Sequence, residues 1–168
     1  LLRDLDELVN QQLAKMLFAN PQRIDYYDRY QEIIDAYNAE QNRATIEKTF
    51  MDLMELASSL DTEQQRYVRE GFSSDEELSV YDLLFSENLT KQEIETIKKV
   101  SVDLLTKIKQ QIAKLDHWTD KQETKAIVDN LIRKTLWQEL PNSYDVSDIQ
   151  TYQKKIYEYV YMRYPEVA

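Results

Sequence analysis

The sequence predicts an all-α fold, an irregular multi-helix bundle of about seven or eight helices. The 168-residue chain contains one glycine and three prolines, which is too few for the many tight turns of a β-rich fold. Apolar residues recur at intervals of three and four along most of the chain, whereas no run of useful length alternates with period two. Four segments also carry the spacing of a capping box, a sequence signature of helix starts.

Three amphipathic helices are expected at the start of the chain. The apolar stripes that predict them cover residues 2–18, 23–37 and 45–60. Asn20 precedes Pro21, and the first helix is expected to end there because the residue before a proline avoids the helical region. Asn38 is a weaker break that separates the second helix from the third.

The remaining sequence predicts a short helix over residues 62–70 and four longer helices. The capping boxes that mark the four longer helices are Ser74–Glu77, Thr90–Glu93, Thr119–Gln122 and Ser147–Gln150. Gly71 is expected to follow the short helix as a left-handed residue. Pro141 and Pro165 are expected to close the last two helices.

Length and composition fit one helical domain over residues 1–168, with possible sub-lobes over residues 1–60 and 61–168. The first residues, LLRDLDELVN, lack a methionine and begin within a helical rhythm, which predicts that the sequence is a fragment of a longer protein. No apolar run approaches the roughly 20 residues of a membrane span, and no signal-peptide pattern is present. A cytoplasmic setting is therefore expected.

The residues that most enzyme sites need are missing from the sequence. The absence of cysteine excludes disulfides and thiolate ligands, and a single glycine excludes a phosphate-binding P-loop and the dinucleotide fingerprint. The spacing Glu123-Thr124-Lys125 matches part of a two-metal nuclease motif, but inside a helix Glu123 and Lys125 diverge by about 200°. No catalytic, cofactor-binding or metal-ligating residue is predicted, and no cofactor is expected in this chain.

The stretch from Asp116 to Pro141 contains the only histidine, His117, and both tryptophans. Trp118 precedes a predicted helix start, and Trp137 lies near the end of the same helix. Because large aromatic side chains dominate core packing, both tryptophans are predicted to be buried anchors that orient this helix. His117 is interpreted as a turn residue rather than as a ligand or a catalytic base.

The formal net charge of −10 opposes a strong overall attraction to the phosphates of nucleic acid. The segment over residues 98–114 differs, because it contains five lysines and one acid, Asp103. The five lysines are possible contacts to a DNA backbone: Lys98, Lys99, Lys107, Lys109 and Lys114. A solvated helix surface is the favoured interpretation of this segment.

Six of the twelve tyrosines lie between Tyr144 and Tyr164. Tyr157, Tyr161 and Tyr164, here called the tyrosine ridge, follow one another at i, i+4 and i+7, about 100° from the apolar stripe of the last helix. Two accounts stay open. A helix wedged between two others buries both stripes, or the tyrosine ridge is exposed and contacts a partner. The three tyrosines are therefore the candidate partner-interface residues.

Several segments occur in an order typical of one protein family. They are RIDYYDRYQEIIDAYN, TIEKTFMDLMELASSL, EELSVYDLLF, HWTDKQETKAIVDNLIRKTLWQELPNSYD and IYEYVYMRYP. With this order, from Ile24 to Tyr164, the chain resembles the C-terminal helical domain of the restriction subunit of type I restriction-modification enzymes. The most specific pieces are EELSVYDLL, at Glu76 to Leu84, and the tryptophan-led helix that ends in a Leu-Pro step.

The resemblance implies a non-catalytic domain that docks the ATP-dependent, DNA-translocating and cleaving subunit onto the methyltransferase-specificity core. It implies that the full-length parent is a type I site-specific deoxyribonuclease with DNA-dependent ATPase activity, which uses ATP and Mg²⁺. The implied partners are the methyltransferase (modification) subunit, the upstream motor domains of the same chain, and DNA in the full assembly, with no membrane. Two alternatives stay open: a free-standing helical protein–protein interaction domain, and a helical domain that contacts the DNA backbone through its Lys98–Lys114 face.

Overall fold

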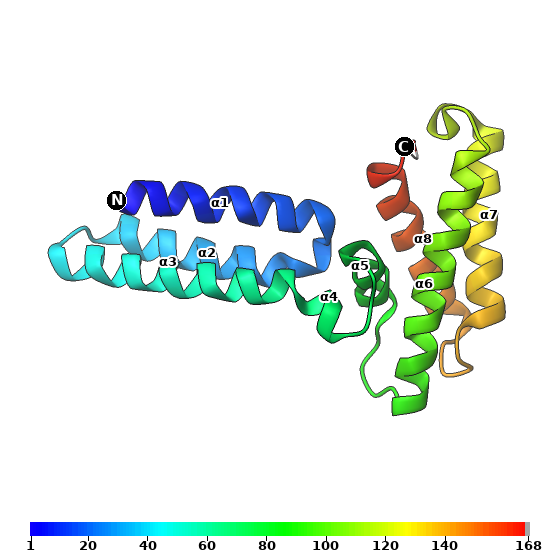
Figure 1. Ribbon diagram of the computed structural model, residues 1–168, viewed down its shortest axis with the longest axis horizontal. Helices are drawn as coiled ribbons and strands as arrows, with labels where there is room; N and C mark the ends of the chain where they lie inside the picture. The colour runs from blue at the N-terminus through cyan, green and yellow to red at the C-terminus, as the bar shows by residue number, and fades with distance from the viewer. Residues whose placement is uncertain (167–168) are drawn as a thin grey trace. The chain divides into compact units, whose positions relative to one another are not determined.

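The computed structural model describes residues 1–166, and within that range all regular secondary structure is helical (Figure 1). Residues 1–166 form eight α-helices and two short 3₁₀ helices, η1 and η2, and contain no β-strand. The all-α prediction and the predicted number of helices are therefore confirmed. None of the helices in this described part has the length and apolar character of a bilayer span.

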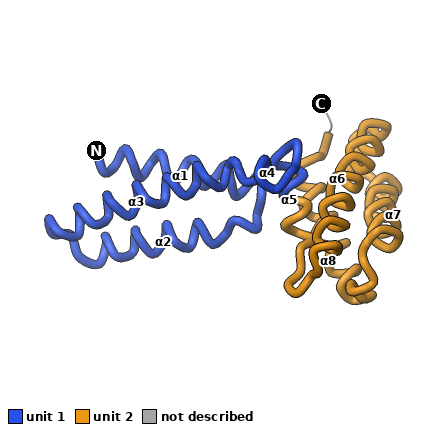
Figure 2. The backbone as a smooth tube through the Cα atoms, turned by 60° about the horizontal axis from the view of Figure 1, so that its bottom comes forward, with its two compact units in different colours: residues 1–79 blue, residues 80–168 orange. Residues whose placement is uncertain are grey.

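The helices belong to two compact units, residues 1–79 and residues 80–168 (Figure 2). Unit 1 contains α1 (Leu2–Ala19), η1 (Pro21–Arg23), α2 (Ile24–Ala39), α3 (Arg43–Gln64), α4 (Arg66–Arg69) and the first half of α5 (Asp75–Leu84). Unit 2 contains the second half of α5, α6 (Lys91–Ala113), η2 (Trp118–Asp120), α7 (Gln122–Glu139) and α8 (Val146–Arg163). The possible sub-lobe boundary at residues 60 and 61 falls inside α3, which continues to Gln64.

The third helix is longer than predicted because its buried side continues past the last apolar residue. Glu63 follows Leu60 by three residues, on the same side of α3, and it is buried because arginines bind its carboxylate. The predicted short helix over 62–70 is therefore wrong: the end of α3 and the single turn of α4 occupy that stretch. Gly71 follows with a φ of +87°, which confirms the predicted left-handed residue.

Unit 1 is a bundle of α1, α2 and α3, in which α2 runs antiparallel to the other two helices (Figure 1). Its core consists of side chains at helical spacing: Val9, Leu13, Met16, Tyr30, Leu53, Leu56 and Leu60. The turn from α1 to α2 forms where predicted. The Asn20 side chain accepts a hydrogen bond from the Gln22 amide at 3.1 Å, and Pro21 takes the first position of η1.

Unit 2 is built around α7, which packs against both α6 and α8. The buried apolar residues of these three helices are Ile97, Val100, Leu104, Leu105, Ile108, Ile112, Val128, Ile132, Leu136, Ile149, Ile156, Tyr159 and Val160. The connections between the three helices are short, so successive helices run antiparallel. η2 lies in the connection between α6 and α7 and directs Trp118 into the core.

Of the four predicted capping boxes, the one at Thr90 and Glu93 is confirmed, with both reciprocal hydrogen bonds formed (3.1 and 3.0 Å). At the start of α5, the Ser74 hydroxyl accepts from the Glu77 amide as predicted, but the Glu77 carboxylate accepts from the Ser73 amide, one residue earlier. α5 therefore begins at Asp75, directly after the predicted cap Ser74.

The other two predicted boxes are wrong. Thr119 lies inside η2, and α7 begins at Gln122 after the extended residue Lys121. α8 starts from a box at Asp145 and Asp148, with hydrogen bonds of 2.8 and 3.0 Å, rather than at Ser147. Aspartate also caps helices well, and a pattern restricted to Ser or Thr followed by Glu or Gln overlooks it.

Candidate functional site

Trp118 is the centre of the most aromatic region of unit 2. Its indole ring is fully buried, and it forms T-shaped contacts with the rings of Tyr157 and Tyr161, at centroid distances of 6.0 and 5.8 Å. The indole Nε1–H donates a hydrogen bond to the main-chain carbonyl of Tyr164 at 2.7 Å. The prediction that Trp118 is a buried anchor is therefore confirmed.

The turn before α7 aims Trp118 inward. His117 adopts a left-handed conformation with a φ of 47°, which reverses the chain direction directly before the tryptophan. The His117 carbonyl accepts from the Asp120 amide at 3.0 Å, and the Trp118 carbonyl accepts from the Thr124 hydroxyl at 2.6 Å. His117 is an exposed turn residue, as predicted.

The tyrosine ridge is partly covered and partly open. Tyr161 is 38% exposed, whereas Tyr157 and Tyr164 are half-buried. Tyr157 and Tyr161 lie against each other with ring centroids 6.1 Å apart, and both rings also contact Trp118. Burial raises the pKa of the Tyr157 hydroxyl above its ordinary value.

Tyr164 follows the end of α8 and has different neighbours. Its ring contacts that of Tyr159 at 6.1 Å, and the Lys109 ammonium lies 5.4 Å from its centroid. The structure thus brings together two of the three predicted interface tyrosines, Tyr157 and Tyr161, over Trp118. The rings of Tyr157 and Tyr161 are held in place on one side by Trp118, which belongs to η2.

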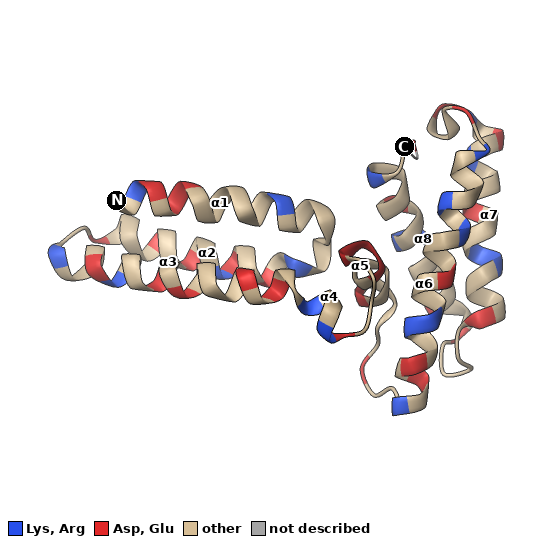
Figure 3. Cartoon of the chain, in the orientation of Figure 1, with Lys and Arg blue, Asp and Glu red and all other residues tan. Residues whose placement is uncertain are grey.

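The five lysines of the segment 98–114 are spread around α6 (Figure 3 marks the basic residues). At about 100° per residue, Lys98 and Lys109 lie on one flank of the buried stripe, whereas Lys107 and Lys114 lie on the other. Lys99 points opposite the core and is exposed. The five lysines therefore do not form a single row that could follow a phosphate backbone.

Three of these lysines also have partners within unit 2. Lys107 binds both Asp103 and Glu139 at 3.0 Å. Lys98 lies over the Tyr81 ring at 5.8 Å, and Lys109 lies over Tyr164 as described above. Lys98, Lys107 and Lys109 therefore already contact groups of the protein, although the sequence had indicated them as possible contacts to DNA.

Trp137 corrects one prediction, because its side chain is 48% exposed. It lies nine residues after Val128, which places it about 180° away around α7. The buried positions at this end of the helix belong to Leu136 and Leu140 instead. Trp137 is therefore not the buried anchor that was predicted, because the helical phase turns its side chain outward.

Unit 1 contains a buried charged cluster that the sequence did not indicate. Arg23 is only 3% exposed, and its Nε donates to Glu63 at 2.8 Å. Its two terminal nitrogens donate to Asp75 at 3.0 and 2.6 Å, and one also reaches the Met16 carbonyl. Glu63 in addition accepts two hydrogen bonds from Arg66 at 2.8 and 3.1 Å.

The pKa shifts of Arg23 and Glu63 favour the charged form of both side chains. Burial alone would lower the pKa of Arg23, but the hydrogen bonds to Asp75 and Glu63 outweigh it and raise that pKa. Burial would raise the pKa of Glu63, but hydrogen bonds from Arg66 and Arg23 hold it below its ordinary value. All three nitrogens of Arg23 donate to protein atoms, so the cluster ties the α1–α2 turn to α3 and α5 rather than forming an anion site.

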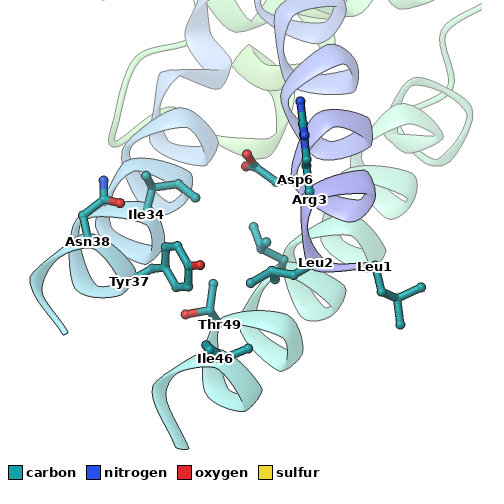
Figure 4. A pocket seen from close by; sticks show the side chains of 10 residues that line it. Leu1, Leu2, Arg3, Asp6, Ile34, Tyr37, Asn38, Ile46 and Thr49 are labelled. Carbon is teal, nitrogen blue, oxygen red and sulfur yellow. The ribbon is translucent and has the colours of Figure 1, made fainter. Parts of the chain in front are cut away.

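Unit 1 also has a pocket of about 520 Å³ where α1 and α3 begin (Figure 4). The Tyr37 ring and Leu2 face each other across it, whereas Leu1 points away. Asp6, at its edge, accepts a hydrogen bond from the Tyr30 hydroxyl at 2.5 Å. The lining contains neither histidine nor lysine, and nowhere in residues 1–166 does the structure group three or more potential metal ligands.

Comparisons with known proteins give one result. Neither the curated proteins nor the solved structures include a match to this chain. The model of a protein family described as "Type I restriction enzyme HindI endonuclease subunit-like, C-terminal" matches residues 2–164, which include nearly all of both units. The resemblance that the order of the sequence segments had indicated is therefore confirmed, and the chain belongs to the family of C-terminal domains of type I restriction enzyme HindI endonuclease subunit-like proteins.

Proposed function

We propose that this domain docks the DNA-translocating and cleaving subunit of a type I restriction enzyme onto the methyltransferase-specificity core. The family match over residues 2–164 carries the proposal, because it assigns the chain to the C-terminal region of an endonuclease subunit. The methyltransferase partner comes from the family resemblance of the sequence. The upstream motor domains of the same chain are the second proposed partner.

In this proposal the domain is non-catalytic and binds no cofactor itself. ATP and Mg²⁺ act in the ATPase and nuclease domains of the full-length parent, and the assembly works on DNA in the cytoplasm. The isolated chain is expected to hydrolyse ATP no faster than a buffer blank. ATP hydrolysis that one point substitution in this chain abolishes would contradict this part of the proposal.

The tyrosine ridge is the proposed contact surface. Tyrosine is enriched at interfaces because its ring is rigid and its hydroxyl tolerates water. Contacts of Tyr157 and Tyr161 with Trp118 restrict both rings before a partner binds, which lowers the entropy that binding costs. Tyr161 is the most exposed of the three and is the best position for a test.

The experiment compares Tyr161→Ala with Tyr27→Ala in the intact restriction subunit. Both tyrosines are 38% exposed, but Tyr27 lies on α2 in unit 1. Tyr161→Ala is expected to weaken binding to the methyltransferase-specificity complex by about 1–3 kcal/mol, whereas Tyr27→Ala leaves it unchanged. Equal affinities of the two variants and the wild type would exclude the ridge as the docking surface.

A further inference from the structure

We infer that the outward face of α7, formed by Trp137, Arg133 and Lys134, is a second docking surface, for a protein partner that offers an apolar pocket bordered by carboxylates. The inference rests on the proposed docking function and adds the position and chemistry of a contact. These three residues are called the α7 face below. The tyrosine ridge lies on another helix, α8.

The exposed indole is the first observation. Trp137 is 48% exposed, and in the described part of the chain its indole makes no contact with another aromatic ring, no cation–π contact and no hydrogen bond. Trp118, by contrast, is fully buried and contacts two tyrosine rings and a main-chain carbonyl. A single exposed apolar side chain is ordinary, so Trp137 gains significance only from the residues beside it.

Those neighbours are cationic. Arg133 and Lys134 precede Trp137 by four and three residues, so all three side chains share one side of α7. Arg133 and Lys134 are exposed, and no carboxylate in residues 1–166 lies within ion-pair distance of either. Tryptophan and arginine are among the residues most enriched at the energetic centres of protein interfaces.

The acids of α7 are directed elsewhere. Asp129, one turn before Arg133, accepts a hydrogen bond from the Gln153 amide of α8 at 3.1 Å. Glu139 binds Lys107 of α6 at 3.0 Å. Glu123 lies in the first turn of the helix, far from Trp137. Arg133 and Lys134 therefore have no acidic partner on α7. A partner surface complementary to them would carry carboxylates around the pocket that receives the Trp137 indole.

A protein surface fits the α7 face better than a DNA duplex does. Unit 2 contains 14 acidic and 13 basic residues, so it presents no broad positive field to a phosphate backbone. An exposed indole near the end of α7 can enter an apolar pocket, which a paired duplex backbone does not offer. Two cations beside one large apolar group match an interface with an apolar centre and a charged rim.

The experiment uses the intact restriction subunit and the purified methyltransferase-specificity complex. The test variants are Trp137→Ala, Arg133→Glu and Lys134→Glu. Ile127→Ala is the apolar control, because Ile127 is also on α7 and is 42% exposed. Lys15→Glu is the charge control, because Lys15 is exposed on α1.

Trp137→Ala is expected to weaken assembly at least tenfold, and each charge reversal at least threefold, while both controls stay within twofold of the wild type. The thermal midpoint of the subunit is expected to stay unchanged, because the indole is exposed. Added salt is expected to weaken the wild-type complex more than the Arg133→Glu complex, a difference that a purely structural role would not produce.

The outcomes separate the two proposals. If Tyr161→Ala weakens assembly and Trp137→Ala does not, the α7 face is excluded and the docking function stands. If neither substitution, nor both together, affects assembly, the tyrosine ridge and the α7 face are both excluded as contact surfaces, and the inference is overturned. If Trp137→Ala reduces binding of duplex DNA and leaves assembly unchanged, the α7 face is a nucleic-acid contact, and the inference of a protein partner is overturned.

Discussion

The Trp118 indole and the Tyr164 carbonyl are joined by a hydrogen bond of 2.7 Å, although 46 residues separate them in the sequence. The bond connects the turn before α7 to the residue that caps α8. It also satisfies the N–H group of a fully buried ring. Trp118 therefore fixes the position of the last helix, and with it the tyrosine ridge.

The two tryptophans should differ sharply in their contribution to stability. Trp118→Ala is expected to lower the free energy of unfolding by about 3–5 kcal/mol, because it removes a fully buried ring and leaves a cavity. Trp137→Ala is expected to change it by less than about 1 kcal/mol. Chemical denaturation of both variants and the wild type measures the difference, and equal losses would contradict the burial of one ring and exposure of the other.

Arg23 is expected to be the most sensitive charged residue of unit 1. Arg23→Met should cost about 3–5 kcal/mol, because it leaves the buried Glu63 carboxylate without one of its two arginine partners. Addition of Glu63→Gln should restore part of the loss by removing the uncompensated charge. Arg43→Met is the control, since the Arg43 side chain is 93% exposed and its ion pair with Glu47 is solvated.

The same cluster predicts a pH dependence of stability. Because the pKa of Glu63 is lower in the folded state than its ordinary value of 4.5, the folded state binds this proton more weakly than the unfolded state does. The stability contributed by Glu63 is therefore present above pH 4.5 and is lost as the pH falls through the lower folded pKa. The free energy of unfolding of Glu63→Gln should decline less steeply below pH 4.5, and parallel curves would contradict the assignment.

The isolated chain is expected to show no measurable binding to nonspecific duplex DNA at physiological salt. The lysines of α6 lie on both flanks of the helix, and the net charge of −10 opposes attraction to phosphate. If they acted together as a phosphate track, the logarithm of the binding constant would fall with a slope of about −0.9 per contact against the logarithm of salt concentration. A micromolar complex with that salt dependence, weakened by Lys99→Glu and Lys114→Glu, would support the DNA-contact alternative.

The fold class and most of the helix positions could be predicted from the sequence, because they depend on interactions within a few residues. One glycine, the helical spacing of apolar residues, the Asn20-Pro21 step and the Thr90–Glu93 box are all local signals, and the structure follows each of them. The family resemblance also depended on local segments in a fixed order. The start of α8 was predicted wrongly because Asp145, rather than Ser147, caps that helix. The helix over 62–70 was predicted wrongly because the buried ion pair of Glu63 extends α3 into that stretch.

Which side chains contact one another depends on how the helices pack, and the sequence pattern did not predict it. The partners of Arg23 come from α3 and α5, and each of Glu63 and Asp75 alone looks like an ordinary surface acid in the sequence. The two tryptophans belong to one stretch of chain, yet Trp118 is covered by α8 and Trp137 is not, because their helical phase and the packing of neighbouring helices differ. Burial depends on residues that are distant along the chain, so spacing alone could not separate an anchor from an exposed contact.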